Sequence, residues 1–466
     1  VLPLSSNPDQ FREEAGLVYF IATSGTGRDL WQTDGTSEGT ALSLDLPGNA
    51  VEFTFRSGQA VVSTLSGSTY SLWYSGTSIA GIAVNSLKNL TTTSDGSVYF
   101  FARATSSSPY YVYRFDGSTA QTVGGPLPAV PSSLVAIDDT LYFTSSSTLY
   151  QVDATNGLQA LYSSPTASLL SRVEKLGDDV YILERMTSSP TRYNLRDSAG
   201  QLLSTDIVWA GTGKLLVSMG DRLYFIANRS GLGQELWSSD GTTAGTQVVT
   251  DLRPGSNGSD AGGLIAGANH VYFSGHDGVS GNFIYRVDSS AVVTRLARFA
   301  PEINNSSVSN LNSRHSATLG NSKVVFSASD GTTGAIYVSD GTPTGTTRLI
   351  NYGTSSTPAQ METLGGTVAF WRPSVSNSLR VTNGTTVTQP TGTTGAIRSA
   401  ARVNSSLFFL ESTWLRTLTG NVVTNVAAVG SGTATEVVGA ANRVFWADQG
   451  KLWVSDGTAS GTFVAR

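Results

Sequence analysis

The side chains best suited to catalysis are few, and they lie mostly in polar loops. The chain has three histidines and no cysteine. His276 and His315 stand in segments rich in Gly, Ser and Asn, whereas His270 directly precedes an apolar triplet, where a structural role is expected. Two loop histidines alone make a weak metal or acid–base site, because such sites also need carboxylates or further ligands. We therefore predict no catalytic residue, no bound metal and no cofactor.

A second group of polar side chains is suited to binding rather than to catalysis. It lies in two long loops and one turn, at residues 251–260, 274–278 and 299–315. Loops that vary on a rigid scaffold commonly bind partners, although each residue taken singly also fits a solvated loop. The predicted binding residues, suited to a sugar or a protein partner, are Arg253, Asn257, Asp260, His276, Asp277, Glu302, Asn304, Asn305, Arg314 and His315.

Carboxylates also recur at one fixed place in a repeated turn. The pattern Asp-Gly-Thr-x-x-Gly-Thr begins at residues 34, 240, 340 and 456. An Asp at the start of a tight turn accepts a backbone N–H bond two residues on, and glycine adopts the positive φ that such turns need. A repeat arranged around a circle would point these carboxylates outward, which argues against a shared ligand. The predicted structural turn residues are Asp34, Gly35, Asp240, Gly241, Asp340, Gly341, Asp456 and Gly457.

These turns belong to a repeat that runs through the whole chain. An apolar pair precedes each turn, Leu-Trp or Ile-Tyr in the four clear copies and worn forms in seven others. The eleven copies follow at steps of 36 to 52 residues, about 42 on average, which is the length of a four-stranded propeller blade. Apolar triplets such as Val18–Phe20 precede the pairs and suit strands buried on both faces. The sequence therefore predicts an all-β propeller of about eleven four-stranded blades.

The array predicts one continuous domain over residues 1–466. Propellers usually have four to eight blades, so eleven copies also fit two rings. The largest step contains residues 299–315, and two rings would have their boundary near 300–315. No linker rich in Pro, Ser or charge interrupts the array, which slightly favours one wide ring.

The full motif resembles a known repeat. The segment 235–246 reads Glu-Leu-Trp-Ser-Ser-Asp-Gly-Thr-Thr-Ala-Gly-Thr, and with its three close copies it resembles the bacterial ELWxxDGTxxGT repeat proteins. The resemblance spans the chain, although only four copies match well. It implies a propeller-like fold and an exported protein, and it implies no reaction. The turn also resembles the structural Asp-box turns of sialidase propellers, but a sialidase's arginine triad with Tyr and Glu is not found in this sequence.

Composition restricts the partners and the setting. The net charge is −5, and the five Lys and 24 Arg are scattered, so no nucleic acid partner is expected. No apolar run approaches 18 residues, so no membrane insertion is expected. The chain begins with Val, and we interpret it as a processed chain whose export signal has been removed. We therefore predict a secreted or cell-surface protein.

Three functions fit this pattern. The first is a non-enzymatic extracellular scaffold, adhesin or assembly subunit that binds another surface or secreted protein, or a further copy of itself. The alternative is a glycan-binding lectin with inter-blade pockets of aromatic, Asn, Asp or Arg side chains, although the worn copies argue against identical pockets in several blades. The third is a propeller lyase or hydrolase. If the chain has a binding site, we predict it in the connections of blades six to eight, because the connections vary strongly in length and two of them lengthen there, at residues 251–260 and 299–315.

Overall fold

Every regular element of the described part of the chain is a β-strand. The computed structural model describes residues 7–25, 27–165, 170–186, 191–208, 215–267, 269–298, 311–320, 322–329, 334–353, 358, 360–392, 395–429, 436–440, 442–448 and 451–465. Within these ranges no helix is long and apolar enough to cross a membrane.

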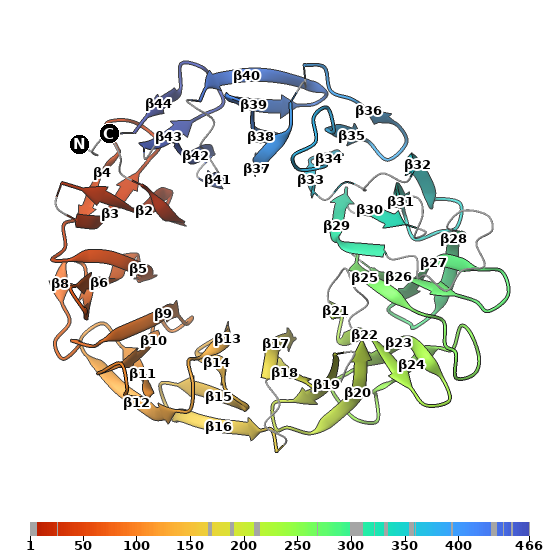
Figure 1. The fold of residues 1–466 in the computed structure, drawn as a ribbon, viewed down its shortest axis with the longest axis horizontal. Helices are drawn as coiled ribbons and strands as arrows, with labels where there is room; N and C mark the ends of the chain where they lie inside the picture. The colour runs from red at the N-terminus through yellow and green to blue at the C-terminus, as the bar shows by residue number, and fades with distance from the viewer. Residues whose placement is uncertain are drawn as a thin grey trace. The chain divides into compact units, whose positions relative to one another are not determined.

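The strands group in chain order into eleven antiparallel four-stranded meanders, called blades 1 to 11 here (Figure 1). Blades 1 to 4 comprise β1 (Asp9–Glu14), β2 (Leu17–Ser24), β3 (Gly27–Thr33), β4 (Ala41–Leu44); β5 (Asn49–Arg56), β6 (Gln59–Ser66), β7 (Thr69–Tyr74), β8 (Thr77–Ser78); β9 (Ser86–Thr92), β10 (Val98–Arg103), β11 (Tyr110–Phe115), β12 (Ala120–Leu127); and β13 (Ser132–Ile137), β14 (Thr140–Ser145), β15 (Thr148–Asp153), β16 (Gly157–Ser163).

Blades 5 to 8 comprise β17 (Leu170–Leu176), β18 (Asp179–Arg185), β19 (Arg192–Asp197), β20 (Leu202–Val208); β21 (Leu216–Met219), β22 (Arg222–Arg229), β23 (Gly233–Ser239), β24 (Gln247–Thr250); β25 (Gly262–Ala266), β26 (His270–His276), β27 (Asn282–Asp288), β28 (Val293–Arg298); and β29 (Leu311–Leu319), β30 (Lys323–Ser329), β31 (Gly334–Ser339), β32 (Thr347–Gly353). Blades 9 to 11 comprise β33 (Gln360–Leu364), β34 (Thr367–Trp371), β35 (Arg380–Thr382), β36 (Val387–Thr388); β37 (Ile397–Val403), β38 (Ser406–Glu411), β39 (Trp414–Thr419), β40 (Val422–Ala428); and β41 (Val437–Ala440), β42 (Arg443–Asp448), β43 (Lys451–Ser455), β44 (Thr462–Val464).

The hydrogen-bonded sheets follow these blades almost one to one. Nine sheets have four strands, and an eight-stranded sheet joins blades 5 and 6 because Ile207 of β20 pairs with Ala227 of β22. The predicted apolar triplets lie in the second strand of their blades, for example Leu223–Phe225 in β22, where they are buried. The predicted all-β fold of four-stranded repeats is therefore confirmed.

The blades divide into two compact units. Unit 1 contains residues 1–173, 398–418 and 424–466, and unit 2 contains residues 174–397 and 419–423. Within unit 1 the first and last blades are neighbours, because Phe445 and Leu452 of blade 11 share one buried cluster with Val18 and Phe20 of blade 1. The number of rings that the blades close remains a prediction.

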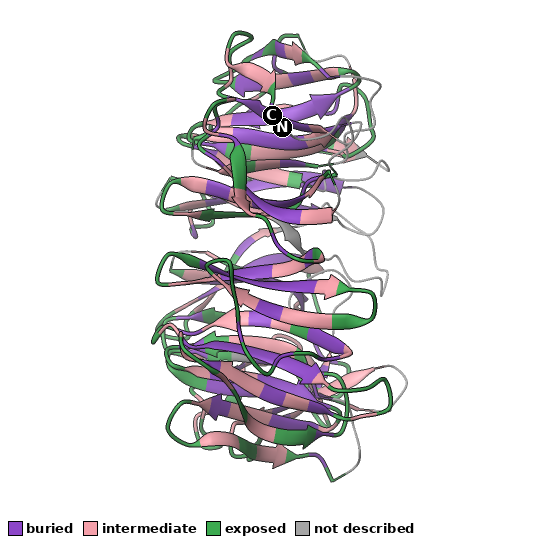
Figure 2. Ribbon diagram, turned by 90° about the vertical axis from the view of Figure 1, so that its left-hand side faces the viewer, coloured by how far each residue is buried: buried purple, intermediate pink, exposed green. Residues whose placement is uncertain are grey.

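The core of each unit lies between facing blades. In unit 2, Leu236 of blade 6 packs with Phe273 and Tyr285 of blade 7, and Tyr272 of blade 7 packs with Phe326 of blade 8. Figure 2 shows that buried residues run along the strands, whereas exposed residues gather in the turns. Packed blades of this kind hold their loops in fixed positions, and the candidate site lies in these loops.

Candidate functional site

The four Asp-Gly-Thr turns share one hydrogen-bond pattern. In blade 6, Oδ1 of Asp240 accepts bonds from N and Oγ1 of Thr242 at 2.9 and 2.7 Å, and N of Gly245 donates to Thr242 Oγ1 at 2.9 Å. The hydroxyls of Ser239 and Thr246 close the turn at 2.6 Å. These bonds, with the Thr242 hydroxyl first, hold the pKa of Asp240 below its ordinary value. The same bonds recur at the turns that begin at Asp34, Asp340 and Asp456.

A side chain at either glycine of the turn would overlap neighbouring atoms. Gly241 has a φ of +89° and receives the Tyr181 hydroxyl of blade 5, and Gly341 likewise receives His270 of blade 7. Arg443 and Phe408 take this place at Gly35 and Gly457. At the second glycine, a Cβ on Gly245 would overlap the carboxylate of Asp240. Each turn thus contacts a neighbouring blade, and its carboxylate is engaged inside the turn.

Two connections of unit 2 meet and bring predicted binding residues together. The connection from β24 to β25 carries Arg253, Asn257 and Asp260. His276 is the last residue of β26, and Asp277 begins the turn to β27. N of His276 donates to the carbonyl oxygen of Ser259 at 2.7 Å, which fixes one connection against the other. The side chain of Arg253 lies so close to Gly278 that a Cβ there would be 2.9 Å from its Cγ.

Internal bonds order the first of these connections at its base. The carboxylate of Glu235 in β23 is fully buried and accepts bonds from N and Oγ of Ser259 at 2.7 and 2.6 Å. Burial raises the pKa of this carboxyl to about 7. The backbones at Gly233 and Gly258 approach so closely that a Cβ on either would overlap the other. The connection therefore has one preferred path over blade 6.

The turn from β26 to β27 is ordered by Asp277. Its Oδ1 accepts three backbone bonds, from N of Val279, Ser280 and Gly281 at 3.0, 2.6 and 3.0 Å. Nδ1 of His276 accepts a bond from N of Gly278 at 2.8 Å. Asp277 and His276 thus shape the turn, and Asp277 is less available to a ligand than its sequence position indicated.

Val279 and Arg295 belong to the same surface but were not among the predicted residues. Val279 is 92% exposed at the tip of the turn. The guanidinium of Arg295 lies 4.6 Å from the ring centre of Phe283 and 3.5 Å from the Asp277 carboxylate, and its side chain is 56% exposed. A single valine in a Gly- and Ser-rich turn carries no periodic signal, so sequence patterns could not identify it. The seven residues that we call the loop site are Arg253, Asn257, Asp260, His276, Asp277, Val279 and Arg295.

The other predicted binding residues are not placed beside the loop site. Glu302, Asn304 and Asn305 lie outside the described residues. Arg314 and His315 belong to strand β29, but their side chains lie outside the described part. These five assignments remain predictions. Among the side chains that are described, no group of three His, Asp or Glu residues could hold a metal ion.

Comparison with known proteins identifies no family, and the likenesses to solved structures are weak. No protein-family model and no curated protein matches the chain. Among solved structures, the tricorn protease matches with a TM-score of 0.30 and 11% identity over 100% of this chain and 62% of that chain. A prolyl endopeptidase matches with a TM-score of 0.34 and 14% identity over 72% of this chain and 55% of that chain. BamB from Moraxella catarrhalis matches with a TM-score of 0.34 and 15% identity over 70% of this chain and 95% of that chain.

The four-stranded meanders of about 40 residues identify the chain as a β-propeller protein. It spans less than two thirds of the tricorn protease and prolyl endopeptidase chains. At these identities and TM-scores the likeness carries no argument about activity. Propellers include enzymes and non-enzymatic scaffolds, so function has to be argued from the site.

Proposed function

We propose that this chain is a non-enzymatic, protein-binding propeller that engages another surface or secreted protein through the loop site of blades 6 and 7. The observation that carries the proposal is the turn at 277–281, which is ordered by its own hydrogen bonds and presents Val279 to solvent. An ordered turn loses little conformational entropy when it binds, so its contacts contribute more fully to affinity.

The chemistry around Val279 suits a protein partner. Arg253 and Arg295 flank the turn, and arginine is enriched among the residues that contribute most to protein–protein affinity. The ring of Phe283 lies against the Arg295 guanidinium. This contact limits the conformational freedom of the Arg295 side chain, which binding would otherwise have to remove. The partner is expected to offer a small apolar pocket for Val279 beside acidic groups for the two arginines.

The proposed setting is the cell surface or the medium. The resemblance to the ELWxxDGTxxGT repeat proteins supports an exported scaffold, adhesin or assembly subunit. The partner is either a different surface or secreted protein or a second copy of this chain.

A pull-down from the envelope and secreted fractions of the producing organism tests the proposal. The variant Val279→Asp removes the apolar tip, and burial of a valine contributes about 1.5–3 kcal/mol, so capture of the partner should fall about tenfold or more. The matched control is Val292→Asp, which changes a 55% exposed valine in the β27–β28 turn of the same blade.

We expect one stoichiometric protein partner with the wild type and with Val292→Asp, and its loss with Val279→Asp. Equal capture by all three proteins would refute the loop site. Metal-dependent turnover that disappears in His276→Ala or His315→Ala would replace the proposal with the lyase or hydrolase alternative.

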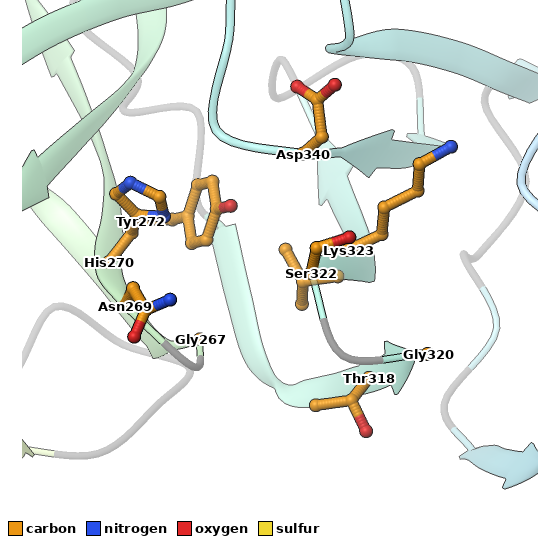
Figure 3. A pocket seen from close by; sticks show the side chains of 10 residues that line it. Gly267, Asn269, His270, Tyr272, Thr318, Gly320, Ser322, Lys323 and Asp340 are labelled. Atoms are coloured by element: carbon orange, nitrogen blue, oxygen red, sulfur yellow. The ribbon is translucent and has the colours of Figure 1, made fainter.

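Glycan binding is a second candidate, favoured by a separate observation. A polar pocket lies between blades 7 and 8 in unit 2. It is independent of the loop site, and its lining includes Asn269, His270 and Ser322 (Figure 3).

A further inference from the structure

The carboxyl group of Glu235 contacts both ends of the β24–β25 connection, which carries part of the loop site. At the start of the connection, N of Leu252 donates to Oε2 of Glu235 at 3.4 Å. Near its end, N and Oγ of Ser259 donate to the two oxygens of Glu235 at 2.7 and 2.6 Å. A bond from N of Ser259 to the carbonyl oxygen of Gln234 at 3.1 Å adds to this end. The path of residues 253–258 therefore depends on one buried carboxyl group.

Ser259 connects this arrangement to the second part of the loop site. It is fully buried, and its carbonyl oxygen accepts the bond from N of His276 at 2.7 Å. A Cβ on Gly275 would lie 2.8 Å from the Leu252 side chain and 3.7 Å from both Oγ of Ser259 and the Tyr285 ring. The missing side chain at Gly275 thus lets the base of the connection pack directly against β26. Loss of this packing would affect both connections of the loop site.

No described cation offsets a charge on Glu235, because none of the ion pairs among the described residues includes it. Two titratable groups face it, Asp251 from the connection and Tyr285 from β27. The Asp251 carboxylate adds negative charge, and its Oδ1 is buried with no partner among the described residues. Burial raises the pKa of Tyr285 to about 12, so the phenol stays neutral. The adjacent strands contribute Ala227 of β22 and Gly275 of β26, which carry no charge. An ionised Glu235 is therefore a buried charge without a counterion, which is costly.

The protonated carboxyl group fits the closed connection without a buried charge. It still accepts the backbone bonds, and the hydroxyl of Ser259 can rotate to accept its proton. The ionised carboxylate instead favours an open arrangement in which water reaches it.

We propose that the Glu235 carboxyl group is a pH-sensitive switch, which holds the connection at 251–261 closed when it is protonated and releases it when it is ionised. The loop site then binds its partner more tightly below neutral pH than above it. This regulation of binding rests on the proposed function of the loop site, whereas the switch itself needs no partner.

Hydrogen exchange of the protein alone tests the switch. Mass spectrometry follows the protection factors of peptides that cover 251–261 and 277–281 between about pH 5 and pH 8.5, each corrected for the intrinsic pH dependence of exchange. Burial raises the pKa of Glu235 to about 7 in the closed state, and the ordinary value of 4.5 applies once the connection is open. Opening should therefore increase, and protection fall, by about 50- to 100-fold over this range.

Three variants separate the switch from a general effect of pH. Glu235→Gln cannot ionise, so its protection should stay constant. Asp251→Asn removes the neighbouring negative charge, which should make the fall in protection smaller. The matched control is Asp29→Asn, which changes the buried carboxylate at the same motif position of blade 1, where it accepts a bond from N of Leu46 at 3.1 Å. It should keep the full fall.

Constant protection in the wild type, or an equal fall in Glu235→Gln, would overturn the switch. If Glu235→Gln does not fold, a fall in Asp251→Asn as large as in the wild type would overturn it. Pull-downs at pH 5 and pH 8.5 then test the regulation of binding, in which capture by the wild type should fall relative to capture by Glu235→Gln. An unchanged ratio would overturn the regulation. Absence of any partner at both pH values, with the fall in protection intact, would refute the proposed function and leave the switch standing.

Discussion

Gly245 allows the Asp240 carboxylate to lie against the backbone of its own turn, and an alanine there tests this arrangement. The added methyl group would overlap both carboxylate oxygens. The carboxylate would have to leave, and it would lose its bonds from N and Oγ1 of Thr242 at 2.9 and 2.7 Å. The variant therefore removes interactions of Asp240 without changing Asp240 itself.

The magnitude follows from those two bonds. A hydrogen bond to a charged group contributes about 1.5–3 kcal/mol, and solvent around the exposed Asp240 weakens both bonds, so together they contribute about 2–3 kcal/mol. We expect Gly245→Ala and Asp240→Ala each to lower the free energy of unfolding by about 2–3 kcal/mol. Because both changes remove the same bonds, the double variant should also lose about 2–3 kcal/mol, which is a coupling of about 2–3 kcal/mol.

Urea unfolding of the wild type, both single variants and the double variant gives these free energies. The matched control is Gly366→Ala, because no atom lies within 4 Å of the methyl group that it adds and its φ is compatible with alanine. It should change the free energy by about 0.5 kcal/mol or less. Additive losses in the double variant, or a Gly245→Ala cost equal to that of Gly366→Ala, would refute the reasoning.

Two further predictions concern buried carboxylates. Burial raises the pKa of Glu235 from 4.5 to about 7, so the folded state binds this proton more tightly than the unfolded chain does. Its contribution to stability is complete below pH 4.5 and is lost as the pH rises through 7. Urea unfolding should therefore show the wild type losing about 3 kcal/mol relative to Glu235→Gln between pH 4.5 and 8, and a constant difference would contradict this. Arg196→Met removes the cation 2.8 Å from buried Glu184 and should cost about 3 kcal/mol or more in thermal unfolding. Adding Glu184→Gln should recover part of that loss, and no recovery would count against the ion pair.

The blade boundaries were predictable because their signals are local. Ten of the eleven apolar pairs begin within the third strand of a blade, such as Leu236 in β23, and Leu379 immediately precedes β35. Strand patterns repeat every two residues and turn residues have fixed conformational preferences, so both can be read over a few positions. The prediction of about eleven blades needed only the period of these signals.

The contacts between blades were not predictable in the same way. Gly35 receives Arg443 from the other end of the chain, and the residue in this place changes to Tyr181, His270 or Phe408 at the other turns. A contact whose partner varies in size and charge leaves no repeated pattern in one sequence. The second role of the motif, as a joint between blades, therefore appears only in the packed structure.

The candidate site was predictable in part. Arg253, His276 and Asp277 were expected on one surface because, in a propeller, the connection between two blades and the connection from the second to the third strand of a blade emerge on the same face. The bond from His276 to Ser259 joins the two connections that carry them. Val279 was not predicted, because its exposure depends on the shape of a turn that the hydrogen bonds to Asp277 order.

Site-specific photo-cross-linking at Val279 tests the central claim most directly, because it reports which molecule touches the tip of the turn. A photoreactive phenylalanine analogue is placed at Val279, and in a matched protein at Val292, and each is illuminated in the envelope and secreted fractions. The account predicts one discrete protein adduct from position 279 and none from position 292. Adducts of equal yield from both positions, or no adduct from position 279 while a partner still co-purifies, would contradict it.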